Sequence, residues 1–286
     1  MIFDKVYNKI IEKLGDNKAI TLTYIRKFKK IPNIKAPKEF CEKLHVVKVS
    51  TWLEDKCDYV DKYKVRDYVE KRLGIKYLPQ LYGVYKKSSE IDFNKLPDKF
   101  VLKLNNGCGC NLIVKNKNNI NEEEVKKLAD TWLQSNYYKI SREKQYKNIE
   151  QVIVCEEYLE DDSGELRDYK LFCFNGEVKF IQVDTGRFSN HIQNFYDKKW
   201  NKLNFTFACE KNNYIDKKPK LLNEMIKKAE ILSSDFPFVR IDFYYANERI
   251  YFGEITFTPK NGHRAFTPKE MDLEIASWID MNKYKI

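Results

Sequence analysis

The chain of 286 residues has no run of apolar residues long enough to form a transmembrane helix. Its first residues also lack the apolar core of a secretory signal peptide. The seven cysteines are scattered, and the one close pair, Cys108 and Cys110, has a single residue between its members, which is the wrong spacing for a zinc knuckle. These absences predict a soluble, cytoplasmic protein whose cysteines are reduced thiols.

The sequence also lacks the usual signatures of nucleic-acid binding. The net charge of +10 is compatible with such a partner, but there is no basic tail, RNA-binding signature or zinc-finger spacing. The lysines are spread along the chain, and the one basic cluster, residues 26–30, is more typical of a solvated helix face. We therefore expect no nucleic-acid partner, whereas a positive field would favour an anionic substrate such as a polyphosphate.

Two common nucleotide-binding motifs and one common metal motif are missing. The glycine-rich segment at residues 103–111 does not end in the Gly-Lys-Ser/Thr of a Walker loop. It is followed by a predicted strand, whereas a Rossmann fingerprint opens a helix. The Asp-x-Asp motif that glycosyltransferases usually carry does not occur, and we find no internal repeat or low-complexity linker.

Hydrophobic periodicity predicts helices and antiparallel hairpins in alternation. Helices are predicted in residues 1–35, 62–73, 121–135, 219–233 and 268–281, with a short helix and connector in residues 38–57. Strands are predicted in residues 78–85, 100–104, 111–115, 151–155, 168–174 and 177–184, and in a hairpin at residues 238–256. Antiparallel sheets with helices packed on them form an α+β fold.

The hairpin at residues 238–256 combines apolar strands with charged side chains. If its loop has three residues, 247–249, Asp242 lies directly opposite Glu254. One face then carries four polar side chains, those of Arg240, Asp242, Glu254 and Thr256. Adjacent carboxylates repel unless a cation lies between them, and oxygen ligands suit Mg²⁺ held together with substrate phosphates. If the loop has two residues, the carboxylates lie on opposite faces as solvated surface charges.

Three further segments have a functional and a plain structural interpretation. Lys103 ends a strand before a turn with two glycines, which lets backbone amides approach phosphate oxygens, but the turn also fits an ordinary hairpin. Glu156 and Glu157 end a strand, where the backbone could contact an adenine edge or the acids could simply face solvent. Asp168 could bind ribose hydroxyls beside Lys170, or the two could form an exposed ion pair.

Taken in order, these segments resemble the ATP-grasp superfamily, and most closely its TupA-like (teichuronopeptide-biosynthesis) group. The resemblance covers residues 58–281 and depends on the order and spacing of the motifs. These motifs are residues 61–63, 103–109, 156–165, 168–176, 236–242 and 251–259. The implied fold is α+β, with two antiparallel-sheet lobes that bind ATP between them.

The resemblance also implies a domain organisation. A reduced helical segment, residues 1–57, precedes an ATP-grasp domain, residues 58–286. The first lobe is residues 58–155 and includes the glycine-rich loop, and the second lobe is residues 156–286. Because an ATP-grasp N-terminal domain normally helps to bind substrate, we expect substrate selection to depend on a partner domain, a dimer or a large acceptor. The oligomeric state stays open.

The resemblance implies roles for individual residues. The phosphates would contact Lys62, Lys103 and the closing loop of Asn106, Gly107, Cys108, Gly109 and Cys110. The adenine and ribose would contact Glu156, Glu157, Tyr158, Leu159, Asp168 and Lys170. Mg²⁺ would be bound by Asp242 and Glu254, and Arg240, Lys103 and Arg187 would be catalytic. Thr256 stands where ATP-grasp ligases commonly have Asn, which leaves the second Mg²⁺ open or moves that role to Asn261.

The implied activity is an ADP-forming, carbon–nitrogen ligase. ATP would phosphorylate a carboxylate, and a small-molecule amine would displace phosphate from the acyl phosphate to form an amide. Arg187 would hold the carboxylate, and His191 is a candidate base or a structural residue; residues 262–264 admit similar roles. The expected substrate is a uronic acid or other sugar-linked carboxylate of a capsule-type cell-surface polysaccharide. The alternatives are an ATP-dependent kinase, a glycosyltransferase and a non-catalytic binding module.

Overall fold

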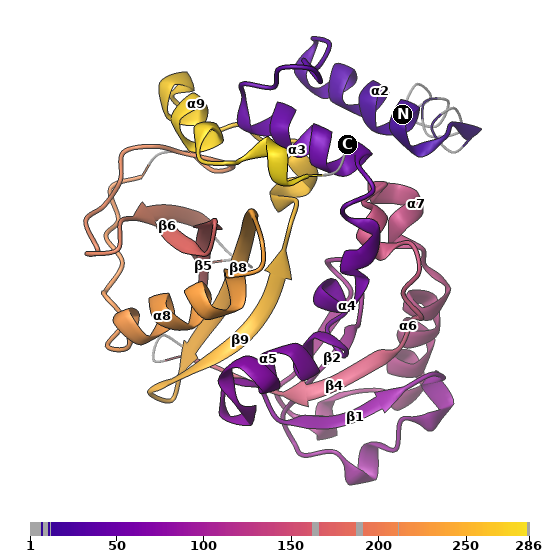
Figure 1. Cartoon of the computed structure of the whole chain (residues 1–286). Coiled ribbons are helices and arrows are strands. Elements are labelled where there is room, and N and C mark those ends of the chain that lie inside the picture. The colour runs from indigo at the N-terminus through magenta and orange to yellow at the C-terminus, as the bar shows by residue number, and fades with distance from the viewer. Residues whose placement is uncertain are drawn as a thin grey trace.

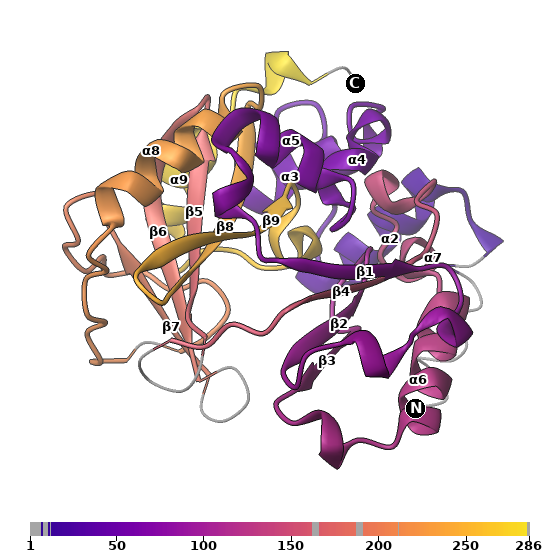
Figure 2. The same cartoon turned by 90° about the horizontal axis from the view of Figure 1, so that it is seen from below.

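The computed structural model describes residues 7, 11, 13–161, 166–186, 191–210 and 212–284. Two antiparallel sheets lie side by side in this part of the chain, and helices pack around them (Figures 1 and 2). The arrangement confirms the predicted α+β fold class. No helix among the described residues is both long and apolar enough to cross a membrane.

The first sheet has the strand order β1-β4-β2-β3. Its strands are β1 (Leu81–Tyr85), β2 (Phe100–Leu104), β3 (Asn111–Val114) and β4 (Ile153–Glu157). Helix α6 (Glu122–Gln134) packs against this sheet through Val125, Ala129 and Trp132, which recur at helical spacing and are buried in one cluster with Leu102. The segment between β2 and β3 is the predicted glycine-rich turn, so a hairpin presents it at the end of the sheet.

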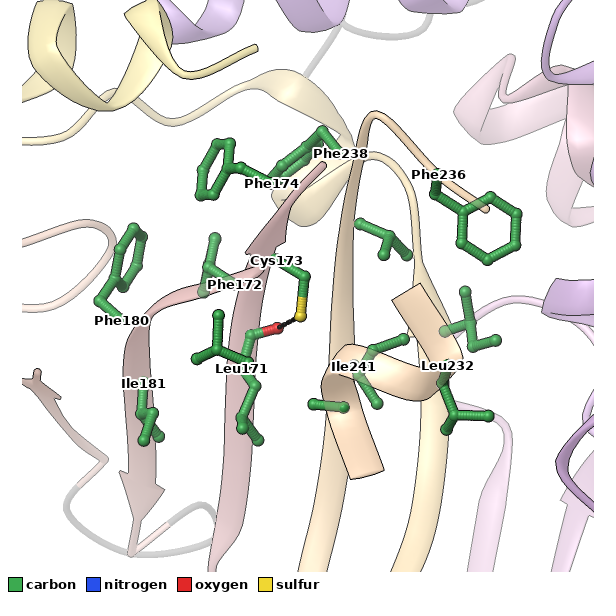
Figure 3. Close-up of a cluster of buried hydrophobic side chains, with 14 of the residues drawn as sticks. Leu171, Phe172, Cys173, Phe174, Phe180, Ile181, Leu232, Phe236, Phe238 and Ile241 are labelled. Carbon is green, nitrogen blue, oxygen red and sulfur yellow. Dashed lines mark hydrogen bonds between the residues drawn. The ribbon is translucent and has the colours of Figure 1, made fainter. Parts of the chain in front are cut away.

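The second sheet has the strand order β7-β6-β5-β8-β9. Its strands are β5 (Asp168–Phe174), β6 (Glu177–Thr185), β7 (Ile192–Tyr196), β8 (Phe238–Ala246) and β9 (Arg249–Thr256). Helix α8 (Leu222–Ser233) covers one face, and Leu232 lies beside Ile241 of β8 in the apolar core (Figures 1 and 3). This core fixes the second sheet as a rigid base for the polar residues on its other face.

Six further α-helices surround the two sheets in the described part of the chain. They are α2 (Asp16–Phe28), α3 (Phe40–Val49), α4 (Cys57–Val60), α5 (Val65–Leu73), α7 (Tyr137–Ser141) and α9 (Lys269–Ser277). Short 3₁₀ helices are η1 (Glu54–Lys56), η2 (Ile75–Tyr77), η3 (Ser88–Glu90), η4 (Phe93–Lys95), η5 (Lys117–Asn119), η6 (Lys144–Tyr146), η7 (Pro259–Gly262) and η8 (Met281–Lys283). Gly74 ends α5 with a φ of 93°, as its position after the last helical residue predicted. Helix α2 ends earlier than predicted, because Lys29 adopts the left-handed conformation.

The β8–β9 hairpin corrects the expected relation between loop length and register. Its loop has two residues, Asn247 and Glu248, with φ values of 50° and 56°. The expectation that such a loop places Asp242 and Glu254 on opposite faces is wrong, because the register shifts at Gly253. This β-bulge adds one residue to β9 and brings Glu254 directly opposite Asp242.

Candidate active site

A cleft of about 380 Å³ lies between the two sheets. Its lining residues from the first sheet and the nearby helices are Lys62, Arg66, Leu78, Pro79, Lys103, Gly107, Cys108, Gly109, Cys110, Asn111 and Glu156. Its lining residues from the second sheet are Tyr244, Phe252, Gly253 and Glu254. The cleft therefore combines the predicted phosphate loop, both predicted phosphate lysines and one of the predicted metal carboxylates.

Three cations converge on the first-sheet side of this cleft. Lys103 Nζ lies 2.8 Å from one carboxylate oxygen of Glu156, and Arg66 Nη1 lies 2.8 Å from the other. Lys62 Nζ donates a hydrogen bond to the carbonyl oxygen of Gly107 at 2.7 Å. Burial lowers the pKa of Lys62, although the carboxylate of Glu254 favours its charged form. The cluster is a preformed site for an anion, with Glu156 orienting two of the cations.

Arg66 was not predicted from the sequence. It follows Lys62 by four residues in the segment predicted as a helix, a spacing that places two side chains on one helical face. That spacing was the available signal. In the structure Arg66 is buried, and its Nη2 also donates a hydrogen bond to the carbonyl oxygen of Pro79 at 2.8 Å.

The glycine-rich loop approaches the cleft with two left-handed residues, Gly107 and Gly109, whose φ values are 67° and 86°. A Cβ at Gly107 would lie 2.5 Å from the ring of Tyr137, so no larger residue fits there without movement. Asn106 is buried, and its Oδ1 has no hydrogen-bond partner among the described residues. Cys108 is exposed at the tip of the loop. The loop is thus packed at its base and open at its tip.

On the second sheet, a guanidinium lies between the two predicted metal carboxylates. Arg240 contacts Asp242 through Nε and Nη2, at 2.6 Å each, and Glu254 through Nη2 at 2.7 Å. The same Nη2 lies 3.1 Å from the hydroxyl oxygen of Thr256. These contacts place all four side chains on one face, the arrangement expected for a three-residue loop, although here the bulge at Gly253 produces it. Arg240 is therefore the cation that offsets the repulsion between the carboxylates.

The two carboxylates differ in environment. Asp242 is 2% exposed, and its burial raises its pKa despite the charges of Arg240 and Lys170. The side chain of Glu254 is 43% exposed and faces the cleft. Burial of its carboxyl group would raise its pKa, but Arg240, Lys170 and Lys62 outweigh this effect and lower the pKa to about 2. Glu254 is therefore ionised at any physiological pH.

The donor set fits Mg²⁺ in its chemistry. Two carboxylates and one hydroxyl, from Asp242, Glu254 and Thr256, are hard oxygen donors, and Mg²⁺ usually takes its other ligands from phosphates and water. The described residues contain no cluster of three or more His, Cys, Asp or Glu side chains suited to a metal. Asn261 is engaged elsewhere, because its carbonyl and amide groups contact Lys48 and the carbonyl oxygen of Ser141.

Asp168 and Lys170 lie in a buried network and do not line the cleft. Lys170 Nζ lies 3.2 Å from Asp168, 3.7 Å from Asp184 and 3.3 Å from Asp242. The alternative of an exposed ion pair is wrong, because the side chain of Lys170 is only 4% exposed. Burial would lower the pKa of Lys170, but the surrounding carboxylates raise it. The ammonium of Lys170 thus lies among three buried acids, and it shares Asp242 with the guanidinium of Arg240.

The predicted adenine segment follows β4 from the first sheet toward the second. Glu156 lines the cleft, whereas the Glu157 carboxylate accepts a hydrogen bond from the backbone of Gln80 at 3.2 Å. The hydroxyl of Tyr158 lies 3.0 Å from Glu160, and Leu159 is buried in a small cluster with Ala246 and Tyr251 of the second sheet. This segment therefore connects the two sheets beside the cleft.

The predicted second-substrate residues are only partly described. Arg187 lies outside the described residues. His191 lies between Asp184 and Cys209, with its Nε2 3.5 Å from Asp184 Oδ2 and its Nδ1 3.6 Å from Cys209 Sγ. Burial lowers the pKa of His263 to about 3, so this histidine is neutral at physiological pH.

The cleft and the sheets define a class of protein. An antiparallel sheet with a glycine-rich loop and two lysines faces a second antiparallel sheet with paired carboxylates, which is the ATP-grasp fold. The chain belongs to the TupA-like ATP-grasp family, whose family model matches residues 42–280. No curated protein sequence matches the chain.

Among solved structures, the chain is similar to several ligases. D-alanine–D-alanine ligase from Bacillus anthracis has a TM-score of 0.43 and 16% identity, covering 72% of this chain and 59% of that one. The Helicobacter pylori enzyme of the same name has a TM-score of 0.43 and 16% identity, covering 78% and 61%. Phosphoribosylamine–glycine ligase from Thermotoga maritima has a TM-score of 0.44 and 12% identity, covering 73% and 51%. The chain thus spans between 51% and 61% of the length of these three ligases.

Proposed function

We propose that the protein is an ATP-dependent carboxylate–amine ligase. The observation that carries this proposal is the cleft itself, where Lys62, Lys103 and the glycine-rich loop face Glu254 across the two sheets. Cations and backbone amides on one side suit a polyphosphate, and a carboxylate on the other side suits its bound metal. Membership of the TupA-like ATP-grasp family supports the same activity.

Each group in the cleft has a role in the proposed phosphoryl transfer. Lys62 and Lys103 neutralise charge on the phosphates, and Glu156 keeps Lys103 oriented before the nucleotide arrives. The loop at residues 106–110 closes over the phosphates and excludes water, which would otherwise hydrolyse an acyl phosphate. Arg240 stabilises the transferred phosphoryl group. Little covalent chemistry falls to the protein, because positioning and charge neutralisation account for most of the catalysis.

Mg²⁺ would be held by Asp242 and Glu254, with Thr256 as a neutral third donor, and would supply charge neutralisation at the phosphate oxygens. For this, Arg240 must share or release the two carboxylates that it contacts in the structure. Its Nη2 also contacts the hydroxyl oxygen of Thr256, so metal binding requires the guanidinium to move away from all three donors. We expect it to turn toward the transferred phosphoryl group.

The substrate class that we propose is a sugar-linked carboxylate of a cell-surface polysaccharide or of its precursor. A small amine would displace phosphate from the acyl phosphate, so that phosphate and an amide are the products. A kinase on the same fold would release ADP without inorganic phosphate. A glycosyltransferase would bind a nucleotide sugar instead of ATP.

Thermal unfolding in the presence of Mg-ATP tests the nucleotide site. A ligand at a hundredfold excess over its Kd stabilises the folded state by about 2.7 kcal/mol. For a chain of this size the melting temperature should rise by roughly 5–10 °C. We expect this rise in the wild type and in Lys99→Ala, whose side chain is 54% exposed in the same lobe, and no rise in Lys103→Ala.

Nucleotide sugars serve as the competing ligands in the same experiment. A rise with nucleotide sugars and none with Mg-ATP would reject the ligase and favour the glycosyltransferase. An equal rise with Mg-ATP in the wild type and in Lys103→Ala would show that ATP binds outside the cleft.

Alkylation of Cys108 provides an independent test of loop closure. Cys108 is the exposed cysteine at the loop tip, and its Sγ lies 3.6 Å from the hydroxyl of Tyr137. We expect Mg-ATP to slow alkylation of Cys108 by N-ethylmaleimide and to leave half-buried Cys57, which lies outside the cleft, unaffected. Mass spectrometry of the labelled peptides measures both rates. Equal labelling of Cys108 with and without Mg-ATP would contradict closure of this loop.

A further inference from the structure

Polar side chains continue from the β8–β9 hairpin across the second sheet to its edge strand, β7. Directly paired residues of an antiparallel sheet share a face. The pairing Asp242↔Lys170↔Gln182 forms one polar row. The pairing Asp168↔Asp184↔Gln193 forms the adjacent row. This polar face of the sheet, which begins at Glu254 and is buried along these two rows, therefore ends at Gln193, three strands beyond β8.

The far end of this surface has amide groups without partners. Gln193 is 4% exposed, and neither its Nε2 nor its Oε1 has a hydrogen-bond partner among the described residues. Gln182 is 1% exposed; its Nε2 donates to Asp184 at 2.7 Å, but its Oε1 has no partner among those residues. A buried polar group without a hydrogen bond costs about 1–3 kcal/mol. Folding alone does not account for an unsatisfied amide at this position.

A cavity of about 340 Å³ lies at Gln193, which falls within the range of small-ligand pockets. Its polar lining consists of amides, a hydroxyl and one lysine, from Gln193, Asn194, Asn204, Asn212, Asn213, Thr206 and Lys202. The ammonium of Lys202 donates to the carbonyl oxygens of Asn212 and Tyr214, at 2.9 and 2.6 Å. Its apolar lining is Phe195, Leu203, Phe205 and Ile215.

This lining specifies the chemistry of the ligand. The amides of Asn194 and Asn212 already donate to Asp216 and to backbone carbonyl oxygens of the protein. The other amide side chains of the lining can both donate and accept hydrogen bonds, as each sugar hydroxyl does. No carboxylate is among the described lining residues, and the lysine is engaged with backbone carbonyls, so the lining suits a neutral group better than a charged one. The apolar side chains suit the C–H faces of a pyranose ring.

We propose that this cavity at the β7 edge binds a sugar unit of the acceptor, at a distance from the reacting carboxylate. The proposal rests on the proposed ligase function for the identity of the acceptor. Three strand spacings separate β7 from β8, which corresponds to about 14 Å. One monosaccharide does not span this separation. The acceptor is therefore an oligosaccharide, whose modified unit lies at the cleft and whose more distant unit lies at Gln193.

Titration calorimetry with two saccharide series tests this site. The probes are oligogalacturonates of one to six residues and neutral gluco-oligosaccharides of the same lengths. We expect affinity to rise with length in at least one series. Gln193→Leu should weaken binding of the longest bound oligomer about tenfold, the effect of roughly 1.4 kcal/mol of lost hydrogen bonding. The same variant should melt at the wild-type temperature or above, since it removes an unsatisfied buried amide.

Two controls separate the outcomes. Asn213→Ala, on an exposed wall of the same cavity, should also weaken oligomer binding, and it keeps the test valid if Gln193→Leu fails to fold. Gln134→Leu, exposed at the end of α6, should leave binding unchanged. No binding of either series to the wild type, or equal binding to the wild type and both cavity variants, would overturn the sugar site. Mg-ATP binding is measured in parallel, so its failure would count against the ligase function and not against the cavity.

Discussion

Replacement of Glu254 by Gln is expected to lower Mg²⁺-dependent ATP turnover by about 10²–10³-fold, the usual effect of removing one electrostatic contact to a transition state. The substitution keeps the shape of the side chain and removes the charge that faces Lys62 across the cleft. The substitution also removes one of the carboxylates that contact buried Arg240, so we expect a lower melting temperature and compare turnover at a temperature where both proteins are folded. ADP formation at saturating Mg-ATP, together with the melting temperature, measures both effects.

A matched control for this variant lies on the same hairpin. Glu248→Gln changes an acid in the β8–β9 turn, whose side chain is 75% exposed and pairs with Lys220. We expect full activity from this control. The pKa of Glu254 is about 2, so lowering the pH from 7 to 5 should not reduce activity through this residue. Equal turnover by Glu254→Gln and the wild type would remove Glu254 from the metal site.

Replacement of Lys170 by Met is expected to destabilise the folded state strongly. It removes the ammonium that contacts Asp168, Asp184 and Asp242, and leaves these carboxylates in a buried site. Loss of one partner from a buried ion pair typically costs about 3–5 kcal/mol. Urea unfolding at pH 7 measures this loss. Lys179→Met on the same sheet is the control, since the side chain of Lys179 is 33% exposed and pairs only with Glu177 among the described residues.

The stability of Lys170→Met is also expected to change with pH in a defined direction. Without the ammonium, burial is expected to raise the pKa of Asp184 and Asp242 in the folded state above the unfolded value of about 3.9. The folded variant then binds more protons than the unfolded one, so its stability should rise as the pH falls from 7 toward 4. In the wild type the charge of Lys170 lowers the pKa of Asp184 against the effect of burial, which gives the opposite trend for that residue. A stability deficit independent of pH would contradict the buried network.

The fold was predictable because its elements have strong local signals. Apolar residues at helical spacing predicted α6 and α8, and the Asn175-Gly176 turn predicted the β5–β6 hairpin. The edge strand β7 was not predicted. It follows residues outside the described part of the chain and has polar residues, such as Gln193 and Asn194, that are buried only by the tertiary fold. Pattern alone does not distinguish such a strand from a loop.

The β8–β9 hairpin, which carries the proposed metal ligands, shows that turn rules alone do not predict its strand register. Turn chemistry determines the loop length, but the facing of Asp242 and Glu254 depends on an added residue at Gly253. A Cβ at Gly253 would lie 3.1 Å from the carbonyl oxygen of Asp242 and 3.2 Å from the ring of Tyr244. Glycine relieves this crowding at the bulge. A glycine inside an apolar strand was the sequence signal for the irregularity.

Long-range charge pairing could not be read from the sequence either. Arg66 in α5 and Glu156 in β4 are 90 positions apart, and only the tertiary fold brings them within hydrogen-bond distance. Lys170 was assigned to the nucleotide, yet the register of three strands places it among buried acids. The roles of these residues toward ATP stay predictions, whereas their positions follow from the sheet.

Equilibrium binding of ATP, with and without Mg²⁺, to the wild type and to Glu254→Gln tests the central claim most directly. The claim is that the cleft between the sheets binds a nucleotide whose metal depends on the paired carboxylates of β8 and β9. We expect Mg²⁺ to increase the affinity of the wild type for ATP and to have little effect on the variant. An increase of the same size in both proteins, or no binding of ATP to either, would contradict the account.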